Sequence, residues 1–179
     1  MNIEQDIPLA AFTSLRLGGA ARFLARCASE QDLREALAWA AARELPVHVL
    51  GGGSNTVFDD AGFAGLVVHI VLRGVDIRLE QDTALVTAAA GEDWDQLVAR
   101  CVAADLSGVE CLSGIPGLVG ATPMQNVGAY GQEVAESIVA VHALTRNTLE
   151  NVTFATEECH FAYRTSRFKG PDRDRFVIT

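Results

Sequence analysis

Alternation of hydrophobic and polar residues over the first seventy positions predicts a small α/β unit. Residues 22–27, RFLARC, alternate polar and apolar side chains as a half-buried strand does. Ser29 with Asp32 three positions later resembles a capping box, and apolar residues then recur at helical spacing for about three turns. Two short apolar runs at 47–50 and 66–70 predict strands. Strand, helix and strand at this spacing indicate a parallel or mixed sheet.

The pattern after residue 71 is different and predicts antiparallel strands. Two runs, 75–80 and 84–89, are separated by three residues, which is the spacing of a hairpin. A second helix is expected after Asp93, because apolar residues form one stripe from there to about Asp105. Later strands are expected at 138–145, 150–154 and 176–179, with a helical turn near 157–159.

We therefore expect an α/β or α+β fold of two lobes, residues 1–70 and 71–179, that share a cleft. A small mixed sheet, an antiparallel sheet and flanking helices make up this fold. The sequence ends inside the apolar run at 176–179 without a polar tail. We accordingly expect a truncated chain whose partner strands, or a further C-terminal domain, are absent.

Composition excludes some classes of function. The 179 residues are 49% hydrophobic and 21% charged, as in a soluble globular protein. No window approaches the roughly 18 uninterrupted apolar residues of a membrane span, and the N-terminus lacks a signal-peptide pattern. A net charge of -9 works against nucleic-acid binding, which needs clustered Lys and Arg. We expect a cytoplasmic, monomeric protein with neither a membrane nor a nucleic-acid partner.

The four cysteines and four histidines are scattered, so no metal site is expected. The sequence contains no CxxC, HxH or HExxH spacing. Apolar neighbours around most cysteines favour buried free thiols. The cysteines are Cys27, Cys101, Cys111 and Cys159.

The first segment that could carry chemistry is a glycine run directly after the strand expected at 47–50. Its residues are Gly51, Gly52, Gly53, Ser54 and Asn55. Glycines permit positive φ and close backbone approach, and their amides can point at an anion, so a pyrophosphate cradle is one interpretation. The run lacks the GK[ST] ending of a P-loop, and no helix follows directly, as the GxGxxG fingerprint requires. A glycine-rich turn at a strand end explains the spacing equally well.

A second segment, from Gly108 to Gly131, is rich in glycine and small residues and is too apolar for a simple loop. Backbone amides and small side chains between residues 113 and 123 could lie along a flat aromatic ring, which fits a flavin better than a compact phosphate. Gln125, Asn126 and Tyr130 add hydrogen-bonding groups. Close packing between elements would explain part of the same glycine content.

A third segment places Tyr163 and Arg164 between aromatic residues that would otherwise look like core. A guanidinium there can bind a carboxylate in bidentate fashion. A surface ion pair is the more common role for an arginine considered alone.

Together and in this order, these segments resemble the UDP-N-acetylenolpyruvoylglucosamine reductases over nearly the whole chain. IPGLVGATPMQNVGAYG at 115–131 and FAYRTSRFK at 161–169 are specific to that family, whereas GGGSN is shared with flavoproteins of the vanillyl-alcohol-oxidase type. The resemblance implies a two-lobed FAD-binding domain of the vanillyl-alcohol-oxidase (PCMH) type. It also implies a cytoplasmic oxidoreductase of peptidoglycan synthesis, hence of cell wall, cell shape and cell division. By the same resemblance, NADPH is expected to reduce non-covalent FAD, and hydride is then expected to pass to UDP-N-acetylglucosamine enolpyruvate to give UDP-N-acetylmuramate.

The resemblance also implies roles for individual residues. Arg164 matches the catalytic arginine, a cation placed to stabilise charge on the substrate carboxylate as hydride arrives. Tyr163, Tyr130 and Gln125 match contacts to the nucleotide-sugar substrate. The implied FAD contacts are Gly51, Gly52, Gly53, Ser54, Asn55, Gly114, Ile115, Pro116, Gly117, Gly120, Ala121, Thr122, Asn126, Gly128, Ala129 and Ile178.

The family completes the reaction with a serine proton donor and an assisting glutamate in a C-terminal substrate domain, and no residue here corresponds to either. Ser166 matches an internal position of the motif. We therefore expect the chain to bind FAD without turning over substrate. Two alternatives stay open: another FAD-dependent oxidase or dehydrogenase on the same scaffold, and a non-catalytic nucleotide-binding module.

Overall fold

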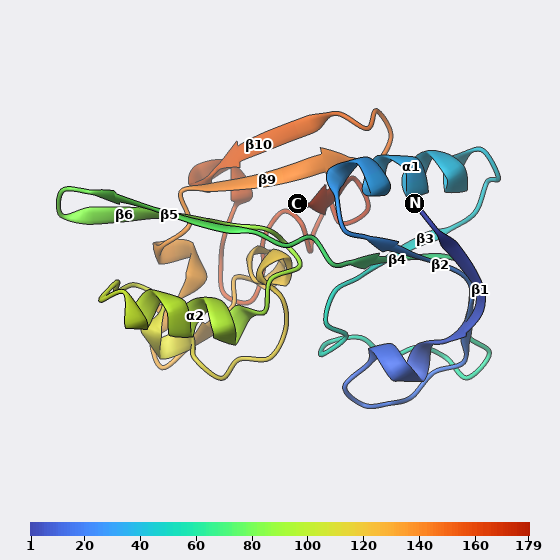
Figure 1. Cartoon of the computed structure of the whole chain (residues 1–179), viewed down its shortest axis with the longest axis horizontal. Coiled ribbons are helices and arrows are strands. Elements are labelled where there is room, and N and C mark those ends of the chain that lie inside the picture. The colour runs from blue at the N-terminus through green and yellow to red at the C-terminus, as the bar shows by residue number, and fades with distance from the viewer. The chain divides into compact units, whose positions relative to one another are not determined.

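In the computed structural model, which describes residues 1–179, the chain forms two compact units (Figure 1). Unit 1 comprises Met1–Leu72 and unit 2 comprises Arg73–Thr179. Their boundary lies close to the change of hydrophobic pattern at residue 71. That the two units are the two lobes of one flavin-binding domain stays a prediction, and each unit is described separately below.

Unit 1 is built on a four-stranded mixed sheet in the order β1-β2-β4-β3 (Figure 1). β1 is antiparallel to β2, whereas β2 and β3 both run parallel to β4. The strand, helix and strand expected from the sequence are confirmed. The strands are β1 (Ile3–Pro8), β2 (Ala20–Cys27), β3 (Val47–Leu50) and β4 (Phe63–Ile70).

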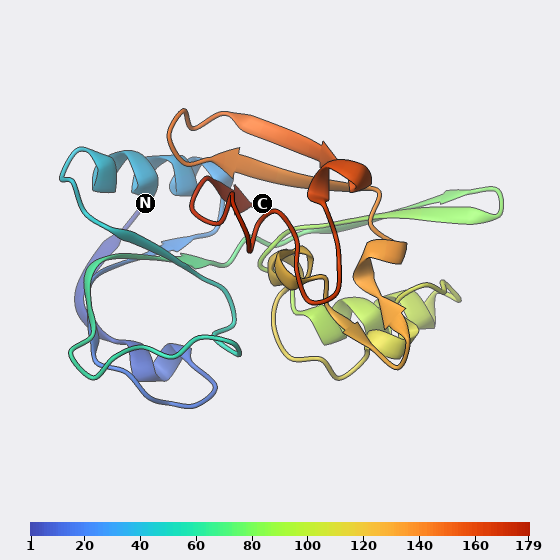
Figure 2. The same ribbon diagram turned by 180° about the vertical axis from the view of Figure 1, so that it is seen from behind.

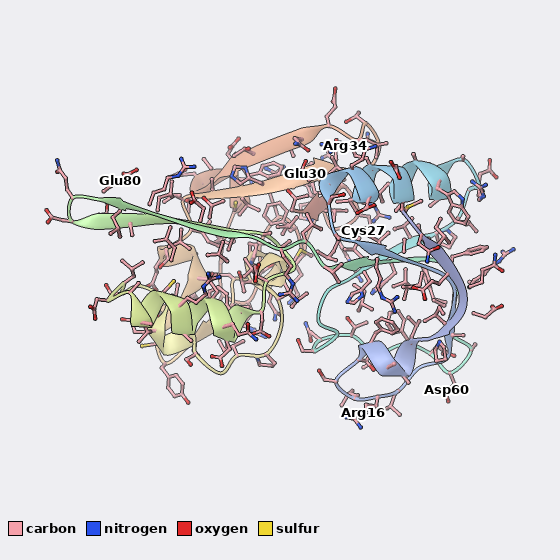
Figure 3. The ribbon with its side chains drawn as sticks, viewed as in Figure 1. Arg16, Cys27, Glu30, Arg34, Asp60 and Glu80 are labelled. Carbon is pink, nitrogen blue, oxygen red and sulfur yellow. The ribbon has the colours of Figure 1, made fainter.

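Helix α1 (Glu30–Ala41) begins at the predicted capping box. The Asp32 amide donates to Ser29 Oγ at 3.1 Å, and the Ser29 amide donates to Asp32 Oδ2 at 3.1 Å. Such a cap is worth about 1 kcal/mol, because it satisfies amides that the first turn leaves without partners. Glu30 and Arg34 form an i,i+4 ion pair at 3.1 Å, and Figure 3 labels both on α1. The helix buries Leu33, Ala36, Leu37 and Ala40.

The core of unit 1 occupies both faces of its sheet. Helix α1 packs against β2 and β4. A second cluster joins Leu9, on the short 3-10 helix η1 (Leu9–Phe12), to Leu24, Leu50 and Val67 of the strands. These four leucine and valine side chains are at most 1% exposed, so they fix the position of the loops that follow the strands.

Unit 2 contains a hairpin and a separate antiparallel sheet. The hairpin pairs β5 (Val75–Glu80) with β6 (Thr83–Ala88), and its loop has two residues instead of the expected three because Thr83 pairs with Glu80. The antiparallel sheet has the order β10-β9-β11. Its strands are β9 (Ala140–Thr145), β10 (Asn151–Ala155) and β11 (Phe176–Ile178). The antiparallel part of the prediction is therefore confirmed.

Helix α2 (Trp94–Ala103) begins at the predicted cap, where Asp93 Oδ1 accepts from the Gln96 amide at 3.0 Å. The expected apolar stripe is confirmed except at Val102, which is exposed, and it packs on residues of the glycine-rich segment. Trp94 also donates from Nε1 to the Leu112 carbonyl at 3.0 Å. The cluster consists of Trp94, Leu97, Val98, Cys101, Leu112, Val127 and Val134.

Beyond α2 the chain uses very short elements. Gly128–Ala129 (β7) pairs with Gln132–Glu133 (β8) in a two-stranded ribbon. The remaining turns are 3-10 helices: η2 (Glu110–Leu112), η3 (Val119–Ala121), η4 (Pro123–Gln125), η5 (Val134–Glu136) and η6 (Thr156–Cys159). The predicted turn near 157–159 is η6.

The segment between η6 and β11 packs as a loop on the β9–β10 pair, and Figure 2 shows it in red leaving η6 and returning to β11. The rings of Phe154 and Phe168 meet edge to face at 5.4 Å. Arg167 pairs with the buried Asp172 at 2.6 Å, and Arg175 pairs with it at 2.8 Å. Hydrogen bonding from Arg167 and Arg175 lowers the pKa of Asp172.

All four cysteines are free, and Cys27, Cys101 and Cys159 are buried as expected. For Cys111 the expectation was wrong, because η2 turns its side chain to solvent. No group of three or more His, Cys, Asp or Glu side chains is arranged to hold a metal ion. Neither α1 nor α2 is sufficiently long and apolar to cross a membrane.

Candidate functional site

The first glycine run, Gly51–Asn55, forms the loop at the carboxyl end of β3 in unit 1. Ligands of sheets with parallel strands commonly bind at such ends. Gly53 has φ +66°, and a Cβ built on it would lie 1.9 Å from the Phe12 carbonyl oxygen. Its own carbonyl accepts from the Ser14 amide at 3.1 Å. Gly53 is therefore required for packing, whereas Gly52 is exposed together with Ser54 and Asn55.

The second glycine segment belongs to unit 2 and is fixed by backbone hydrogen bonds to the chain just before α2. The Trp94 amide donates to the Gly117 carbonyl at 3.1 Å. The Gly120 amide donates to the Ala90 carbonyl at 2.9 Å, and the Val119 amide to the Glu92 carbonyl at 2.9 Å. These three hydrogen bonds fix the register of residues 117–120 against residues 90–94.

Glycines within this second segment have different roles. A Cβ on Gly120 would lie 2.5 Å from the Ala90 Cβ, so packing explains Gly120. Gly114 has φ +78°, and a Cβ there would meet nothing within 4 Å. Open space beside Gly114, with Pro116 and Ala121 exposed nearby in the chain, leaves room for a flat ligand.

Asp95 holds the start of this segment, and sequence reasoning missed it. Its Oδ1 accepts from the Gly114 amide at 2.6 Å and from the Ser113 hydroxyl at 2.9 Å. These hydrogen bonds, the one from Gly114 first, lower the pKa of Asp95 because they favour its charged form. The only signal in the sequence is an acid in the first turn of a helix, which has many commoner explanations.

Tyr163 and Arg164 occupy the corner of a two-residue turn. The Ala162 amide donates to the Thr165 carbonyl at 3.2 Å, and the Thr165 amide donates to the Ala162 carbonyl at 3.1 Å. Arg164 adopts φ +54°, which few non-glycine residues do. Tyr163 is 85% exposed, and Arg164 is also exposed. The turn therefore presents both side chains outward.

Arg164 contacts the end of the glycine-rich segment. Its Nη2 donates to Gln125 Oε1 at 3.3 Å, across 39 positions of sequence. Lys169 Nζ donates to the Arg164 carbonyl at 3.0 Å. The structure thus brings together two of the predicted substrate contacts, Gln125 and Tyr163, with the predicted catalytic arginine.

Asn126, predicted to contact FAD, lies behind this turn and is 1% exposed. Its Nδ2 donates to Glu133 Oε2 at 2.6 Å and to the Ala162 carbonyl at 3.3 Å. Its Oδ1 accepts from the Ala135 amide at 3.1 Å. Both amide hydrogens and one of the two lone pairs of the amide oxygen are therefore directed at protein groups.

Tyr130 stands at the tip of the β7–β8 ribbon and is 92% exposed. Tyr130 (φ +51°) and Gly131 (φ +83°) both have positive φ, as the tight turn of a two-residue hairpin requires. Gly128 and Ala129 lie half-buried in β7. The ribbon packs against η2, and at its tip the Tyr130 side chain is turned to solvent.

Unit 2 also contains a cavity of about 750 Å³ between its hairpin, α2 and β9. Gly120, Thr122 and Ile178, three of the predicted FAD contacts, are among its lining residues. The other predicted contacts of unit 2 lie outside this lining. Because the glycine run Gly51–Asn55 belongs to unit 1, a shared site with these residues stays a prediction.

Comparison with known proteins gives matches over most of the chain. Residues 21–149 match the family model described as an FAD binding domain. The UDP-N-acetylenolpyruvoylglucosamine reductase of Streptomyces avermitilis is 47% identical over 173 residues, which are 97% of this chain and 46% of that protein. The namesake from Salinispora arenicola is 49% identical over 171 residues, 95% of this chain and 47% of that protein. The chain spans about half the length of these curated relatives.

Solved structures give a consistent result for the fold. UDP-N-acetylenolpyruvylglucosamine reductase from Thermus caldophilus matches with a TM-score of 0.77 and 28% identity, covering 100% of this chain and 60% of that one. The 6-hydroxy-D-nicotine oxidase from Arthrobacter nicotinovorans matches with a TM-score of 0.63 and 20% identity, covering 88% of this chain and 36% of that one. The second match indicates a shared fold only.

Proposed function

The chain belongs to the FAD-binding domain family, and on this premise we propose that it is the flavin-binding part of a UDP-N-acetylenolpyruvoylglucosamine reductase. The resemblance inferred from its motifs is confirmed by relatives that are 44% to 49% identical. The expected fold class is confirmed by the reductase and oxidase structures that share it. Because the chain spans about half of those relatives, activity and substrate belong to the proposed whole protein.

The proposed reaction is reduction of UDP-N-acetylglucosamine enolpyruvate to UDP-N-acetylmuramate, a peptidoglycan precursor. Bound FAD would supply the hydride-transfer chemistry, taking hydride from NADPH and delivering it to the vinyl carbon of the enolpyruvyl group. The substrate is a nucleotide sugar, and the proposed setting is a cytoplasmic, monomeric enzyme. A serine that protonates the second carbon of the vinyl group and a glutamate that assists it would come from residues outside 1–179.

Residues of both glycine-rich segments fit FAD by size and conformation. Gly52, Ser54 and Asn55 are small and exposed at a strand end, where their amides can approach the pyrophosphate without side-chain obstruction. Gly114 opens onto unfilled space, and Ala121 is exposed with only a methyl side chain. We therefore assign the pyrophosphate to Gly51–Asn55. The ring system we assign to residues 114–122, with Gly128 and Ala129.

Arg164 would act on the substrate carboxylate. Hydride arriving at the vinyl carbon increases negative charge on that group, and a guanidinium already in place stabilises the charge without reorganising. The hydrogen bond from Arg164 to Gln125 is the single observation that carries this proposal. It joins the two family-specific segments, 115–131 and 161–169, at one exposed point.

Replacement of the arginine in the full-length flavin-loaded enzyme tests the proposal. Arg164→Lys retains the charge and loses the fixed bidentate geometry, so kcat should fall about 100-fold or more with a smaller change in KM. Arg78→Lys is the matched control, because Arg78 is an exposed arginine paired with Asp76 on the hairpin. Arg164→Lys with the kcat of the parent would remove Arg164 from the mechanism.

Spectroscopy of the 179-residue chain separates the alternatives. Flavin absorbance bands after reconstitution with FAD are expected, and their absence would favour a non-catalytic module. Anaerobic bleaching of the flavin by an alcohol or hydroxy acid, without NADPH, would favour a different oxidase or dehydrogenase. Oxidation of NADPH by this chain alone in response to the enolpyruvyl nucleotide would refute the expected dependence on further residues.

A further inference from the structure

Asn126 lies where three segments of unit 2 meet. It follows η4 directly, its Oδ1 accepts from the Ala135 amide in η5, and its Nδ2 reaches the Ala162 carbonyl of the arginine turn. Its backbone is left-handed, with φ +45°, which asparagine adopts more readily than most residues. A fully buried amide at such a junction controls the spacing of the segments it joins.

Ala162 supplies the carbonyl that closes the turn carrying Arg164. This carbonyl accepts from the Thr165 amide at 3.1 Å and from Asn126 Nδ2 at 3.3 Å, which uses both of its lone pairs. The left-handed backbone of Arg164 costs about 1–2 kcal/mol, so the turn needs support from its surroundings.

A second anchor holds the other side of the turn. Ser166 is 3% exposed, and its Oγ donates to the Met124 carbonyl at 2.7 Å. Residues 124–126 are therefore hydrogen-bonded to Ala162, directly before the two exposed corner residues, and to Ser166, two positions after Arg164. Gln125, the contact of the guanidinium, lies between the two anchoring positions.

Glu133 fixes the orientation of the Asn126 amide. Its carboxylate accepts from Nδ2 at 2.6 Å, a charge-assisted hydrogen bond, while the Ala135 amide approaches the oxygen on the other side. The reverse orientation would point the amide oxygen at a carboxylate and a carbonyl. Only a primary amide supplies two donors to these acceptors together with one acceptor for the Ala135 amide.

We propose that Asn126 is a positioning residue for Arg164, acting through the Ala162 carbonyl and kept in its orientation by Glu133. This inference rests on the proposed function for the identity of the reaction, but its geometry does not depend on it. It replaces the expected direct contact between the Asn126 side chain and FAD. Asn126 would thus act on catalysis without touching flavin or substrate.

Two variants separate positioning from folding. In Asn126→Asp the new carboxylate faces Glu133 and cannot donate to Ala162, so both contacts are lost. In the double variant Asn126→Asp with Glu133→Gln, the glutamine amide introduced at position 133 can donate to the new carboxylate. The Ala135 amide keeps an acceptor in both variants. The double variant therefore restores the contact with position 133 and leaves the contact with Ala162 broken.

Two readouts are needed, one of which is independent of activity. In the 179-residue chain, the melting temperature reports folding, and hydrogen exchange of the Thr165 amide reports closure of the turn. In the full-length flavin-loaded enzyme, kcat and KM report the position of Arg164. Glu133→Gln alone is the control for loss of the Glu133 charge, because Asn126 can still donate to the side-chain oxygen of the introduced glutamine and to Ala162.

For the double variant we expect a melting temperature close to that of the parent, faster exchange at Thr165 and a kcat at least tenfold lower with little change in KM. A kcat that recovers together with the melting temperature would overturn the proposal, because the role of Asn126 would then be structural only. Unchanged exchange at Thr165 in the double variant would overturn it too. If Asn126→Asp does not fold, the double variant and its control carry the test. Failure of the proposed function would appear separately, as a full-length flavin-loaded parent enzyme that does not reduce the enolpyruvyl nucleotide with NADPH.

Discussion

Different kinds of interaction stabilise unit 1 and, separately, the site segment of unit 2. Unit 1 has four strands and a capped helix around apolar clusters, with regular hydrophobic periodicity behind them. The site segment of unit 2, from Gly114 to Glu136, has only 3-10 turns and two-residue strands as regular elements. Individual side chains fix it, chiefly Asp95, Asn126 and Ser166 through hydrogen bonds to backbone groups.

The contrast extends to the glycines. Gly53 in unit 1 is surrounded by backbone, whereas Gly114 in unit 2 faces open space. A sequence does not distinguish a glycine that close packing requires from a glycine that leaves room for a ligand. Substitutions should therefore damage stability in the first case and ligand affinity in the second.

The largest expected effect is that of Gly53→Ala. The new Cβ would lie 1.9 Å from the Phe12 carbonyl oxygen in a backbone with φ +66°, so unfolding free energy should fall by at least about 3 kcal/mol. Gly114→Ala is the matched control, since its strain alone should cost about 1 kcal/mol. Urea unfolding of both variants measures the difference. Equal losses would show that packing does not distinguish the two glycines.

The next effect is that of Asp95→Ala on FAD affinity. Gly114 would lose the acceptor of its amide, and FAD affinity should fall about tenfold, the scale of one charge-assisted hydrogen bond. Because Asp95 is exposed, the melting temperature should change little. A titration that gave the affinity of the parent would show that Asp95 does not organise the flavin segment.

Protonation of Asp95 in acid should also remove the hydrogen bond from the Gly114 amide, and only below a defined pH. The pKa of Asp95 in the folded protein lies below its ordinary value of 3.8. The stability that the charged carboxylate contributes is therefore fully present above pH 3.8 and is lost as the pH falls through the lower, folded pKa. Hydrogen exchange of the Gly114 amide, corrected for its intrinsic rate, should therefore be constant near neutral pH and rise only in acid. A rise near neutral pH would assign the effect to another group.

The sequence was most informative where periodicity decides structure. It predicted β2, β3, β4, both helices and the Ser29 capping box, because each rests on local spacing. It missed β1, whose IEQDIP sequence has no clean alternation and whose Asp6 has φ +51°. The candidate site residues were predicted from motifs, which give their positions along the chain. The contacts that hold these residues in place could not be predicted, since hydrogen bonds such as that from Ser166 to Met124 join residues 42 positions apart.

The smallest expected effect is a difference in reaction rate between thiols buried inside the two units and the thiol at the surface. Burial raises the pKa of Cys27 to about 12 and of Cys159 to about 11, and it raises that of Cys101. Thiolate is the reactive form, so these three should react slowly with a thiol reagent near neutral pH. Cys111 is exposed and should react first. Four equally fast thiols would indicate that the interiors open readily.

Titration of FAD into Ala121→Leu tests the central claim, that small residues of the second glycine segment leave room for the flavin. Ala121 is exposed, so a leucine there should fold normally while its side chain occupies the space assigned to the ring. Ala103→Leu, at an exposed position of α2, is the control. We predict that Ala121→Leu binds FAD at least about tenfold more weakly, a loss of about 1.4 kcal/mol or more, while Ala103→Leu binds as the parent does. Unchanged FAD affinity in Ala121→Leu would contradict the account.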